Sequence, residues 1–448
     1  TNTVEVNLEG KTHPVDTGFL VFNEKTYPNL LALFAQLEVA HTASEMSFSV
    51  SLQKPHLAWA GRSLATVFAQ KRNLLRPQFW RMLIDILRFN RNSQAWLAAQ
   101  GQEKGQAQTL NAASKDACTA YTLADFLQQG GYSQAFRDWY LLPMAAAIWS
   151  CPTQQVAAMP LLTFIRFCQN HGLLQVFDRP AWRTVLGGGR SYVRKMASQL
   201  AQRATICLSC PVRSVRWVGM RSDESEHSDE LSARWSLIYE QGGERQEAHF
   251  DQLVLACHSD QSLAILDQAS FPSEHTGAQQ MALLKNLLAK IRYEKNRAVL
   301  HTDTAVLPAD ERLWSAWNYQ ANEPSTECAA AKEQALAVSY LINRLQPLPF
   351  TTPVIVTLNP PASGLDTPKI LAEFDYAHPV FDAAAIAAQQ QLHAVQGLNG
   401  LWLAGAWCAY GFHEDGLKSA LVVANAMGVL APWQLGDGLV ASAKRSAN

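Results

Sequence analysis

The chain has 448 residues, a formal net charge of −1, 48% apolar residues and 17% charged residues. This composition excludes a chain that is disordered throughout, because it provides enough apolar side chains for a large core. The near-zero charge gives no reason to expect nucleic acid as a partner. The length suffices for two domains or for one large interleaved domain.

The N-terminal residues predict a hairpin, from the alternation at 4–8, the turn at 9–10 and the return at 13–16. Residues 16–22 then run into a predicted helix, whose inner face would carry Leu30, Leu31, Phe34 and Leu37. Gly18 in this run has two interpretations. It either lets the backbone approach a ligand closely or marks a strand bend.

Residues 45–185 have the pattern of an inserted, mainly helical region. A strand is predicted at 48–52, and helices are predicted at 63–70, 77–92, 122–129, 133–149 and 160–171. Thr122 and Asp125 have the spacing of a capping box. We expect Pro143 to kink its helix and the polar segment 93–118 to form a loop.

One part of this insert is strongly basic. Only Asp85 opposes six basic residues there, which are Lys71, Arg72, Arg76, Arg81, Arg88 and Arg91. The other face of the helix would carry Phe79, Leu83, Ile86 and Leu87. A basic amphipathic helix over 71–91 can lie on an anionic membrane or receive an acidic acyl carrier. The alternative is an ordinary solvated helix face over the core.

The second half of the chain begins at the glycine triplet 187–189, which marks a boundary before a new helix. A strand is predicted at 212–217. The nearly continuous apolar run 250–257 is typical of a strand buried on both faces of a parallel sheet. Further strands predict an antiparallel sheet within a second insert, 275–395, at positions 297–301, 314–319, 337–340 and 354–357.

The eight cysteines are scattered, and only Cys207 and Cys210 form a CxxC motif. No second pair or histidine cluster completes a zinc site, so no metal site is predicted. Both cysteines lie in a strand-like run that Pro211 ends, which predicts buried free thiols. No apolar run is long enough to span a membrane, and no signal-peptide pattern is present. We therefore expect a cytoplasmic protein, with peripheral membrane contact as the alternative that the basic helix leaves open.

Near the C-terminus, the sequence predicts a strand, a glycine-bearing loop and a helix. The strand covers 401–404, Asp415 is a predicted N-cap, and the helical apolar spacing ends at Gly428. This arrangement directs backbone N–H groups and the positive end of a helix dipole at a ligand that carries or develops negative charge.

Gly405-Ala406-Trp407 and the run 410–416 resemble the C-terminal flavin-contacting motif of the FAD-dependent amine oxidase-like superfamily. More narrowly, the chain resembles bacterial predicted NAD/FAD-binding oxidoreductases that are associated with cyclopropane fatty acid synthesis. Further strings match these proteins in the same order, at 177–193, 293–297, 343–346, 358–360 and 378–382. The resemblance therefore covers nearly the whole chain.

The resemblance implies an α/β fold, with an FAD-binding Rossmann-like domain of the glutathione-reductase and amine-oxidase type interleaved with an α+β substrate domain. The FAD-binding domain would comprise 1–45, 186–274 and 396–435. The substrate domain would comprise 46–185 and 275–395, and 436–448 would be a flexible tail. No GxGxxG occurs in the chain. We therefore expect the first βαβ unit, which would bind the FAD pyrophosphate, to be missing.

The resemblance also implies roles for individual residues. The flavin-contacting residues would be Asp16, Gly18, Phe19, Val212, Gly405, Ala406, Trp407, Asp415, Gly416 and Leu417. The candidates for catalysis are His413 and Glu414, with Trp407 and Tyr410 beside the flavin ring. The candidates for the substrate cavity are Trp59, Trp317, Tyr319 and Tyr410, together with His301 and Asn318. Each cavity candidate is alternatively an ordinary core or sheet-surface residue.

His413 has two interpretations: it shuttles a proton, since an unperturbed histidine titrates near neutral pH, or it only caps the loop. One departure from the superfamily concerns amines. Amine oxidases usually carry Gly-Glu at Gly405-Ala406 or Ala406-Trp407, and that carboxylate is absent here unless Glu414 or Asp415 replaces it.

The leading hypothesis is an FAD-dependent oxidoreductase that transfers hydride from or to a lipid or fatty-acyl substrate through flavin N5. The lipid part rests on the family association. One alternative is a flavin amine oxidase or desaturase. Another is a noncatalytic flavoprotein partner of a lipid-modifying methyltransferase.

Overall fold

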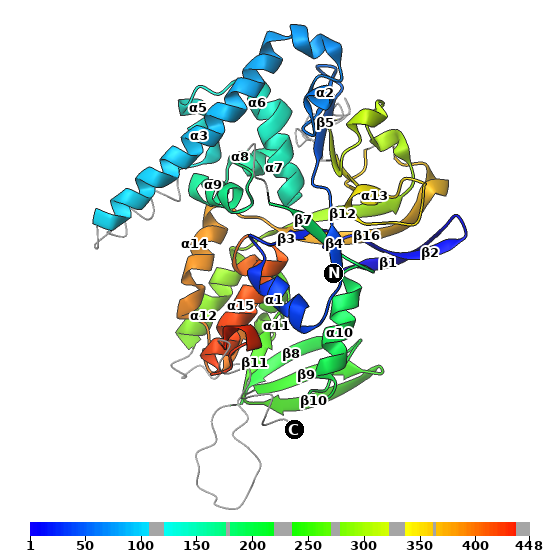
Figure 1. Cartoon of the computed structure of the whole chain (residues 1–448). Coiled ribbons are helices and arrows are strands. Elements are labelled where there is room, and N and C mark those ends of the chain that lie inside the picture. Colours follow the sequence, from blue (N-terminus) through cyan, green and yellow to red (C-terminus); the bar gives the residue numbers. More distant parts are fainter. Residues whose placement is uncertain are drawn as a thin grey trace, which may run out of the picture. The chain divides into compact units, whose positions relative to one another are not determined.

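The computed structural model describes residues 1–106, 121–175, 180–218, 235–269, 278–321, 337–361 and 364–435 (Figure 1). The predicted tail lies outside these residues. The chain divides into two compact units. Unit 1 comprises Thr1–Tyr27, Gln36–Lys195 and Glu294–Ala383, and unit 2 comprises Pro28–Ala35, Met196–Tyr293 and Ala384–Asn448. The predicted functional domains have other boundaries and stay a prediction.

The predicted N-terminal hairpin is present in unit 1. Strands β1 (Thr3–Leu8) and β2 (Lys11–Asp16) pair antiparallel around Glu9 and Gly10, both at positive φ. Two positive φ values are typical of the turns that match the twist of a two-residue hairpin. A small antiparallel sheet follows, in the order β3 (Phe22–Asn23), β7 (Trp182–Val185) and β4 (His41–Ala43).

The largest sheet has seven strands and belongs to unit 1. Its order is β16 (Ile370–Pro379), β12 (Tyr293–His301), β15 (Ile355–Leu358), β14 (Ala337–Leu341), β13 (Trp317–Ala321), β5 (Phe48–Leu52) and β6 (Leu57–Ala60). β12, β15, β14 and β13 pair antiparallel as predicted, whereas β13 and β5 pair parallel. Strands from both predicted inserts therefore share one mixed sheet.

The helices of unit 1 are α2 (Leu64–Val67), α3 (Pro77–Gln106), α5 (Leu123–Gln129), α6 (Gln134–Phe136), α7 (Leu142–Trp149), α8 (Thr153–Ala157), α9 (Leu161–Asn170), α10 (Arg190–Leu200, of which 190–195 belong to this unit) and α13 (Ile342–Leu345). The predicted capping box is confirmed, because the Asp125 amide donates to Thr122 Oγ1 and the Thr122 amide donates to Asp125 Oδ2.

Three helix predictions for unit 1 were partly wrong. α3 continues to Gln106 through the segment predicted as a loop, because its Ala, Gln, Glu and Lys residues are good helix formers. Residues 107–118 of that prediction lie outside the described part of the chain. The helix predicted at 63–70 is shorter and is followed by a 3₁₀ turn, Lys71–Leu75. The helix predicted at 133–149 is interrupted by a π-helical turn, Arg137–Leu141, just before Pro143, which lacks the N–H that a regular α-helix would use. The expected kink at Pro143 stays a prediction.

Unit 2 contains a parallel pair, β11 (Leu253–Leu255) and β17 (Leu401–Leu403), and an antiparallel sheet of β8 (Val212–Trp217), β9 (Trp235–Gln241) and β10 (Glu244–Phe250). Its helices are α1 (Pro28–Gln36, of which 28–35 belong to this unit), α11 (Ser259–Asp267), α12 (Ala278–Ala289), α14 (Ala383–Gln391, from 384 on) and α15 (His413–Ala426).

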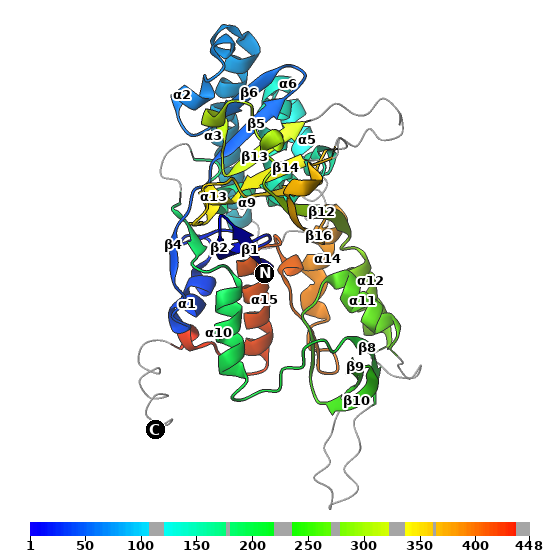
Figure 2. The ribbon, with the colours of Figure 1, turned by 90° about the vertical axis from the view of Figure 1, so that its right-hand side faces the viewer.

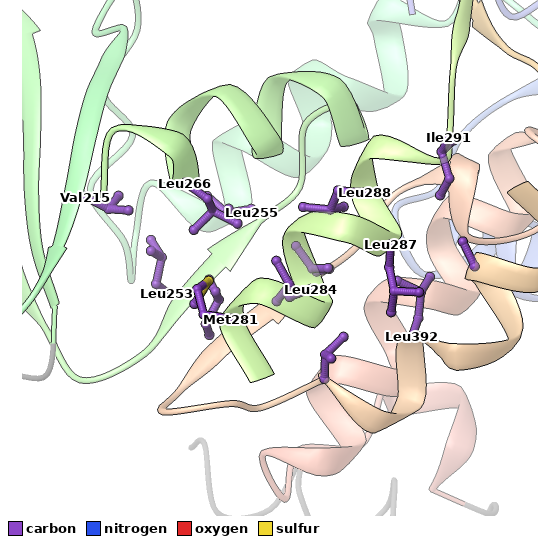
Figure 3. Close-up of a cluster of buried hydrophobic side chains, with 14 of the residues drawn as sticks. Val215, Leu253, Leu255, Leu266, Met281, Leu284, Leu287, Leu288, Ile291 and Leu392 are labelled. Carbon is purple, nitrogen blue, oxygen red and sulfur yellow. The ribbon is translucent and has the colours of Figure 1, made fainter. Parts of the chain in front are cut away.

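The core of unit 2 is formed where strands β8, β11 and β17 meet helices α11, α12 and α14. Figure 3 shows Leu253 and Leu255 of β11 in one cluster with Met281, Leu284 and Leu287 of α12. The prediction that the 250–257 strand is buried on both faces was wrong, because Val254 is 43% exposed. Among the described residues β11 pairs only with β17, so this strand lies at a sheet edge.

Candidate functional site

The loop between β17 and α15 is held by hydrogen bonds within unit 2. The Gly405 amide donates to Ser419 Oγ at 2.8 Å, and Ser419 Oγ donates to the Gly416 carbonyl at 2.7 Å. The Gly411 amide donates to the Ala406 carbonyl at 3.1 Å. Ser419, in the second turn of the helix, therefore ties Gly405 in the loop to the first turn of α15.

Asp415 braces this loop from inside the helix. Its Oδ2 accepts hydrogen bonds from the amides of Tyr410 (3.2 Å) and Phe412 (3.1 Å). The predicted N-cap at Asp415 was therefore wrong: the helix begins at His413, Phe412 is the N-cap, and Asp415 is the third helical residue. Burial raises the pKa of the Asp415 carboxyl, although the Phe412 amide acts in the opposite direction.

Glu414 is buried and binds the N-terminus of α1. Its carboxylate accepts from the Asn29 side chain (2.7 Å), the Asn29 amide (3.2 Å) and the Leu30 amide (2.9 Å). Amides at a helix N-terminus lack partners within the helix, and a carboxylate there is favoured by the helix dipole. Glu414 therefore has a structural task. Asp415 likewise holds the loop through its bonds to the Tyr410 and Phe412 amides. Neither carboxylate is therefore available to replace the missing superfamily carboxylate.

His413 is the first residue of α15. Burial lowers the pKa of its imidazole to about 3, so the ring is neutral at neutral pH. The expectation of a proton shuttle assumed an unperturbed pKa, and the structure corrects that assumption. A neutral imidazole still offers one donor and one acceptor nitrogen, which fits the alternative role in hydrogen bonding.

Trp407 belongs to the core of unit 2. Its indole is 2% exposed, and Nε1 donates to the Cys257 carbonyl at 3.0 Å. The expectation that this side chain lies beside a flavin ring stays a prediction. A Cβ on Gly405 would lie 2.4 Å from Trp407 Nε1, so glycine is required there to let the indole pack.

Asp16 is a buried residue of unit 1 whose carboxylate accepts hydrogen bonds from three separate segments of the chain. The Gly189 amide donates to both carboxylate oxygens (3.0 and 2.8 Å), Gln346 Nε2 donates at 2.8 Å, and Thr3 Oγ1 donates at 2.5 Å. Gly188 is at φ +78°, and a Cβ there would lie 2.7 Å from Thr3 Cγ2. Burial raises the pKa of Asp16, while these donors act in the opposite direction. This carboxylate joins β2 to the start of α10.

The remaining flavin candidates occupy three environments. Gly18 is exposed, and Phe19 is half-buried between Phe22 and Tyr192. Val212 begins β8 and packs against the core of unit 2. Leu417 is half-buried in α15. The prediction of flavin contacts by these residues stays a prediction.

Three of the cavity candidates share one face of the seven-stranded sheet. Trp59 of β6 and Tyr319 of β13 both pair with Val50, so the three side chains form a row. Trp317 lies two residues from Tyr319 on the same face and pairs with Tyr340. The registers place only apolar and aromatic residues on this face, which we call the apolar sheet face: Phe48, Val50, Leu52, Leu57, Trp59, Ala298, Leu300, Trp317, Tyr319, Ala321, Val338, Tyr340, Val356 and Leu358.

Helical backbone of unit 1 covers part of the apolar sheet face. Trp59 Nε1 donates to the Trp139 carbonyl in the π turn, and Tyr340 Oη donates to the Ala147 carbonyl in α7, both at 3.3 Å. Burial raises the pKa of Tyr319 to about 12. The indole N–H of Trp317 is buried and has no acceptor among the described residues.

His301 and Asn318 do not lie on that face, which corrects their assignment to the same cavity. Asn318 accepts from Ser49 Oγ (2.8 Å) and donates to the Ser339 carbonyl (3.1 Å). Ser339 Oγ lies 2.8 Å from Thr357 Oγ1, which lies 2.7 Å from His301 Nε2. These five residues form a buried polar row, and burial lowers the pKa of His301 to about 4.

Sequence reasoning missed the partners that hold the candidate residues. Asn29 with Glu414, Gln346 with Asp16 and Ser419 with Gly405 are long-range pairs that no spacing indicates. Tyr340 was also missed as a cavity candidate, although a signal was available. The alternation of β14 places it on the apolar sheet face, and this pattern can be seen in the sequence. Among the described residues, no group of His, Cys, Asp and Glu could hold a metal ion.

Two glycines leave room for a group that approaches the backbone. A Cβ on Gly18 would meet only the Asn2 amide nitrogen, at 3.7 Å. A Cβ on Gly416 would make ordinary contacts with Ala406, the nearest at 3.4 Å. Neither glycine lies in the left-handed region of φ, so the chain's own conformation and packing do not require glycine there. Glycine at both positions fits a ligand that lies against the main chain.

Comparison with known proteins gives a consistent result. The family model described as flavin containing amine oxidoreductase matches residues 2–325. Similar solved structures include a fatty acid isomerase from P. acnes (TM-score 0.57, 12% identity, 95% of this chain and 89% of that chain). They also include putrescine oxidase bound to putrescine (0.56, 10%, 95% and 90%) and cyclohexylamine oxidase from Brevibacterium oxydans (0.54, 13%, 93% and 88%). No protein with a curated description matches in sequence.

Proposed function

The chain belongs to the flavin containing amine oxidoreductase family and is an FAD-dependent oxidoreductase, and we propose that its substrate is a lipid or fatty-acyl chain. In an oxidation, a substrate carbon would lose a hydride to flavin N5 and the neighbouring atom a proton to solvent, which leaves a new double bond. Dioxygen, reduced to hydrogen peroxide, is the electron acceptor that we name for this reaction.

We assign the contacts to FAD by segment. Within unit 2, the loop and first helical turn at 405–417 would hold part of the cofactor. The backbone around Gly18 stays a predicted contact that concerns unit 1 by itself. FAD supplies the hydride chemistry, and the protein supplies binding and orientation. Asp415 and Ser419 keep the loop in one conformation before the cofactor binds, through their bonds to Tyr410 and Gly405. His413, neutral at neutral pH, can donate or accept a hydrogen bond there.

The apolar sheet face supports an acyl substrate. Its paired residues, as far as the registers define them, are uncharged, and its aromatic members Trp59, Trp317, Tyr319 and Tyr340 would favour an uncharged chain over a cationic amine, whose desolvation is costly. Asp138 of the π turn acts on Tyr319, but burial raises the pKa of its carboxyl and so disfavours its charged form. We assign the substrate to this face because it holds the sequence-predicted cavity residues. A long alkyl chain would gain about 0.8 kcal/mol for each methylene that leaves water.

The family name and two structural relatives support an amine as the second candidate. Putrescine oxidase and cyclohexylamine oxidase act on amines by their names, whereas the P. acnes enzyme is a fatty acid isomerase. At 10–13% identity these similarities concern the fold alone. Against an amine stand the missing superfamily carboxylate and the commitment of Glu414 to α1.

The test is flavin reduction by substrates of each class. The purified protein, supplied with FAD, should absorb at roughly 375 and 450 nm, as oxidised flavin does. Under anaerobic conditions, we expect unsaturated fatty acids or their acyl esters to bleach the longer-wavelength band, and putrescine and cyclohexylamine to leave it unchanged. In air, the same acyl substrates should yield peroxide.

Every other outcome contradicts the proposal in a specific way. Bleaching by amines alone would establish the second candidate. Flavin bands without bleaching by either class would exclude both. A protein that stays colourless with excess FAD would favour the noncatalytic partner of a methyltransferase. Gly416→Ala provides a control for the flavin site: we expect reduced flavin occupancy at unchanged thermal stability, because the added methyl fits the chain itself.

A further inference from the structure

A cluster of exposed apolar side chains lies at one end of unit 1, on α2, the 3₁₀ turn and the start of α3. Figures 1 and 2 both place these elements together, in blue. Among the described residues of unit 1, nine large apolar side chains are exposed, and six of them fall between residues 64 and 87. These six, which we call the apolar ridge, are Leu64, Leu74, Leu75, Trp80, Ile84 and Leu87.

Two contacts join the middle of the apolar ridge. Trp80 Nε1 donates to the Leu74 carbonyl at 2.9 Å, which places the indole against the 3₁₀ turn. The Phe68 and Trp80 rings are 5.2 Å apart and join the end of α2 to α3. Trp80, Ile84 and Leu87 follow at helical spacing on one face of α3. Leu87 had been expected on the core-facing side, but it is 60% exposed.

The other face of α3 fixes the helix to the protein. Phe79, Met82 and Phe89 are fully buried in unit 1. Asp85 is buried as well, and it accepts from Arg81, Arg88 and the Ser133 amide. These contacts pack one side of α3 into the core of unit 1. The opposite side of the helix, which carries Trp80, Ile84 and Leu87, is therefore turned outward.

Within residues 64–91, the exposed charged side chains that accompany the apolar ridge are all basic. Between residues 64 and 91 there are six basic side chains, and the single carboxylate, Asp85, is buried. Arg76 and Arg88 serve the fold, since they donate to the His56 and Gly130 carbonyls. Lys71 and Arg72 are exposed at the 3₁₀ turn beside Leu75, and Arg81 and Arg91 are exposed along α3.

We propose that the apolar ridge and its basic residues dock unit 1 on an anionic lipid bilayer. Exposed leucine, isoleucine and tryptophan insert at the boundary of headgroups and acyl chains, and lysine and arginine at the same level attract anionic headgroups. Leu75 is 86% exposed, so its side chain contributes little to the core of unit 1. Nucleic acid would use the charges but would not need the apolar side chains between them.

This docking differs from membrane insertion of a helix. None of the described helices combines the length and the apolar character that a membrane-spanning segment needs. The contact would therefore be peripheral, reversible and sensitive to salt, since a surface charge contributes only within about 10 Å at ordinary ionic strength. The inference concerns the outer surface of unit 1 and holds whichever substrate the enzyme uses.

The test is co-flotation of the full chain with vesicles. We expect binding to phosphatidylglycerol-containing vesicles, weak binding to pure phosphatidylcholine and release at high salt. Lys71→Gln with Arg72→Gln should lower the partition coefficient about 10- to 30-fold. Leu75→Ser should lower it about tenfold. All variants should keep the circular dichroism spectrum and melting temperature of the parent, because the substituted side chains are exposed.

Matched controls lie in unit 2. Leu208 is 82% exposed, so Leu208→Ser removes a comparable apolar side chain elsewhere. Arg203→Gln with Arg245→Gln removes two exposed charges. Both controls should bind like the parent. Equal losses in controls and ridge variants, or equal binding to both vesicle types, would refute the proposal. Retention on a polyglutamate resin without vesicle binding would also refute it and indicate an acidic protein partner.

Discussion

Replacing Glu414 tests whether this buried carboxylate is structural or catalytic. It receives three hydrogen bonds, two of them from backbone amides that begin α1. Hydrogen bonds to a charged acceptor contribute about 1.5–3 kcal/mol each, and a buried donor without its partner costs about 1–3 kcal/mol. Because the three bonds share one acceptor and are not additive, we expect Glu414→Ala to cost about 3–5 kcal/mol. Glu414→Gln keeps an acceptor oxygen and should cost about 1–2 kcal/mol.

Hydrogen exchange at α1 is the most specific assay, since the two units can unfold separately and one global free energy would average them. Amides of residues 28–36 should exchange faster in Glu414→Ala, and less so in Glu414→Gln. Lys418→Ala is the control. Its ammonium lies 3.7 Å from Glu414 and is half exposed, so its loss should cost less than about 1 kcal/mol. Unchanged exchange in Glu414→Ala, together with lost flavin reduction, would refute the structural role and establish a catalytic one.

Three further predictions concern packing, thiols and pH. Gly405→Ala should lower stability by about 1–3 kcal/mol in urea unfolding, because its methyl would overlap the Trp407 indole; parent-like stability would show that the indole moves freely. Cys207 is exposed and should react with a thiol reagent in the native protein within minutes, whereas buried Cys168, whose pKa is raised by burial, should react only on unfolding. Mass spectrometry of the labelled peptides distinguishes the two. His301 has a pKa of about 4 in the folded protein and an ordinary pKa of roughly 6.5 in the unfolded chain. Between these two pH values its imidazole is neutral when folded and binds a proton when unfolded. Stability should therefore fall by about 3 kcal/mol between roughly pH 6.5 and 4, and His301→Gln should flatten that part of the profile; an unchanged slope would contradict the shift.

Local patterns predicted the elements of this chain better than their ends. The N-terminal hairpin follows from alternation and a Glu-Gly turn, and both are local properties. The start of α15 was misplaced because Asp415 is a good N-cap by residue type, yet the carboxylate reaches back from the third helical position to the Phe412 amide. An aspartate at the N-cap and an aspartate at the third helical position look the same in a sequence. Residue type alone therefore does not fix where the helix begins.

The environment of individual side chains was harder to predict than the strands that carry them. Cys207 and Cys210 were predicted in a buried strand, but they lie in a loop, Cys207 exposed and Cys210 half-buried. An apolar run that ends at a proline can be a buried strand or the loop before one. Here it is the loop, because strand β8 begins only at Val212. His301 and Asn318 were assigned to the aromatic cavity by residue type. The alternation of β13 alone would have excluded Asn318, whereas His301 required knowledge of the pairing between β12 and β15.

The buried polar row from Ser49 to His301 has a consequence for the register of the sheet. Ser49 and Asn318 are 269 residues apart in the chain, and β5 must pair with β13 rather than with any other strand. A shift of one residue would turn Asn318 toward Trp59 and Val50 and bury its amide without partners, while Trp317 and Tyr319 would face hydroxyl groups. A fully hydrogen-bonded row therefore makes a shifted register costly, whereas apolar contacts alone would discriminate less between registers. In this sheet the row favours the observed register of β5 and β13 over a shift by one residue.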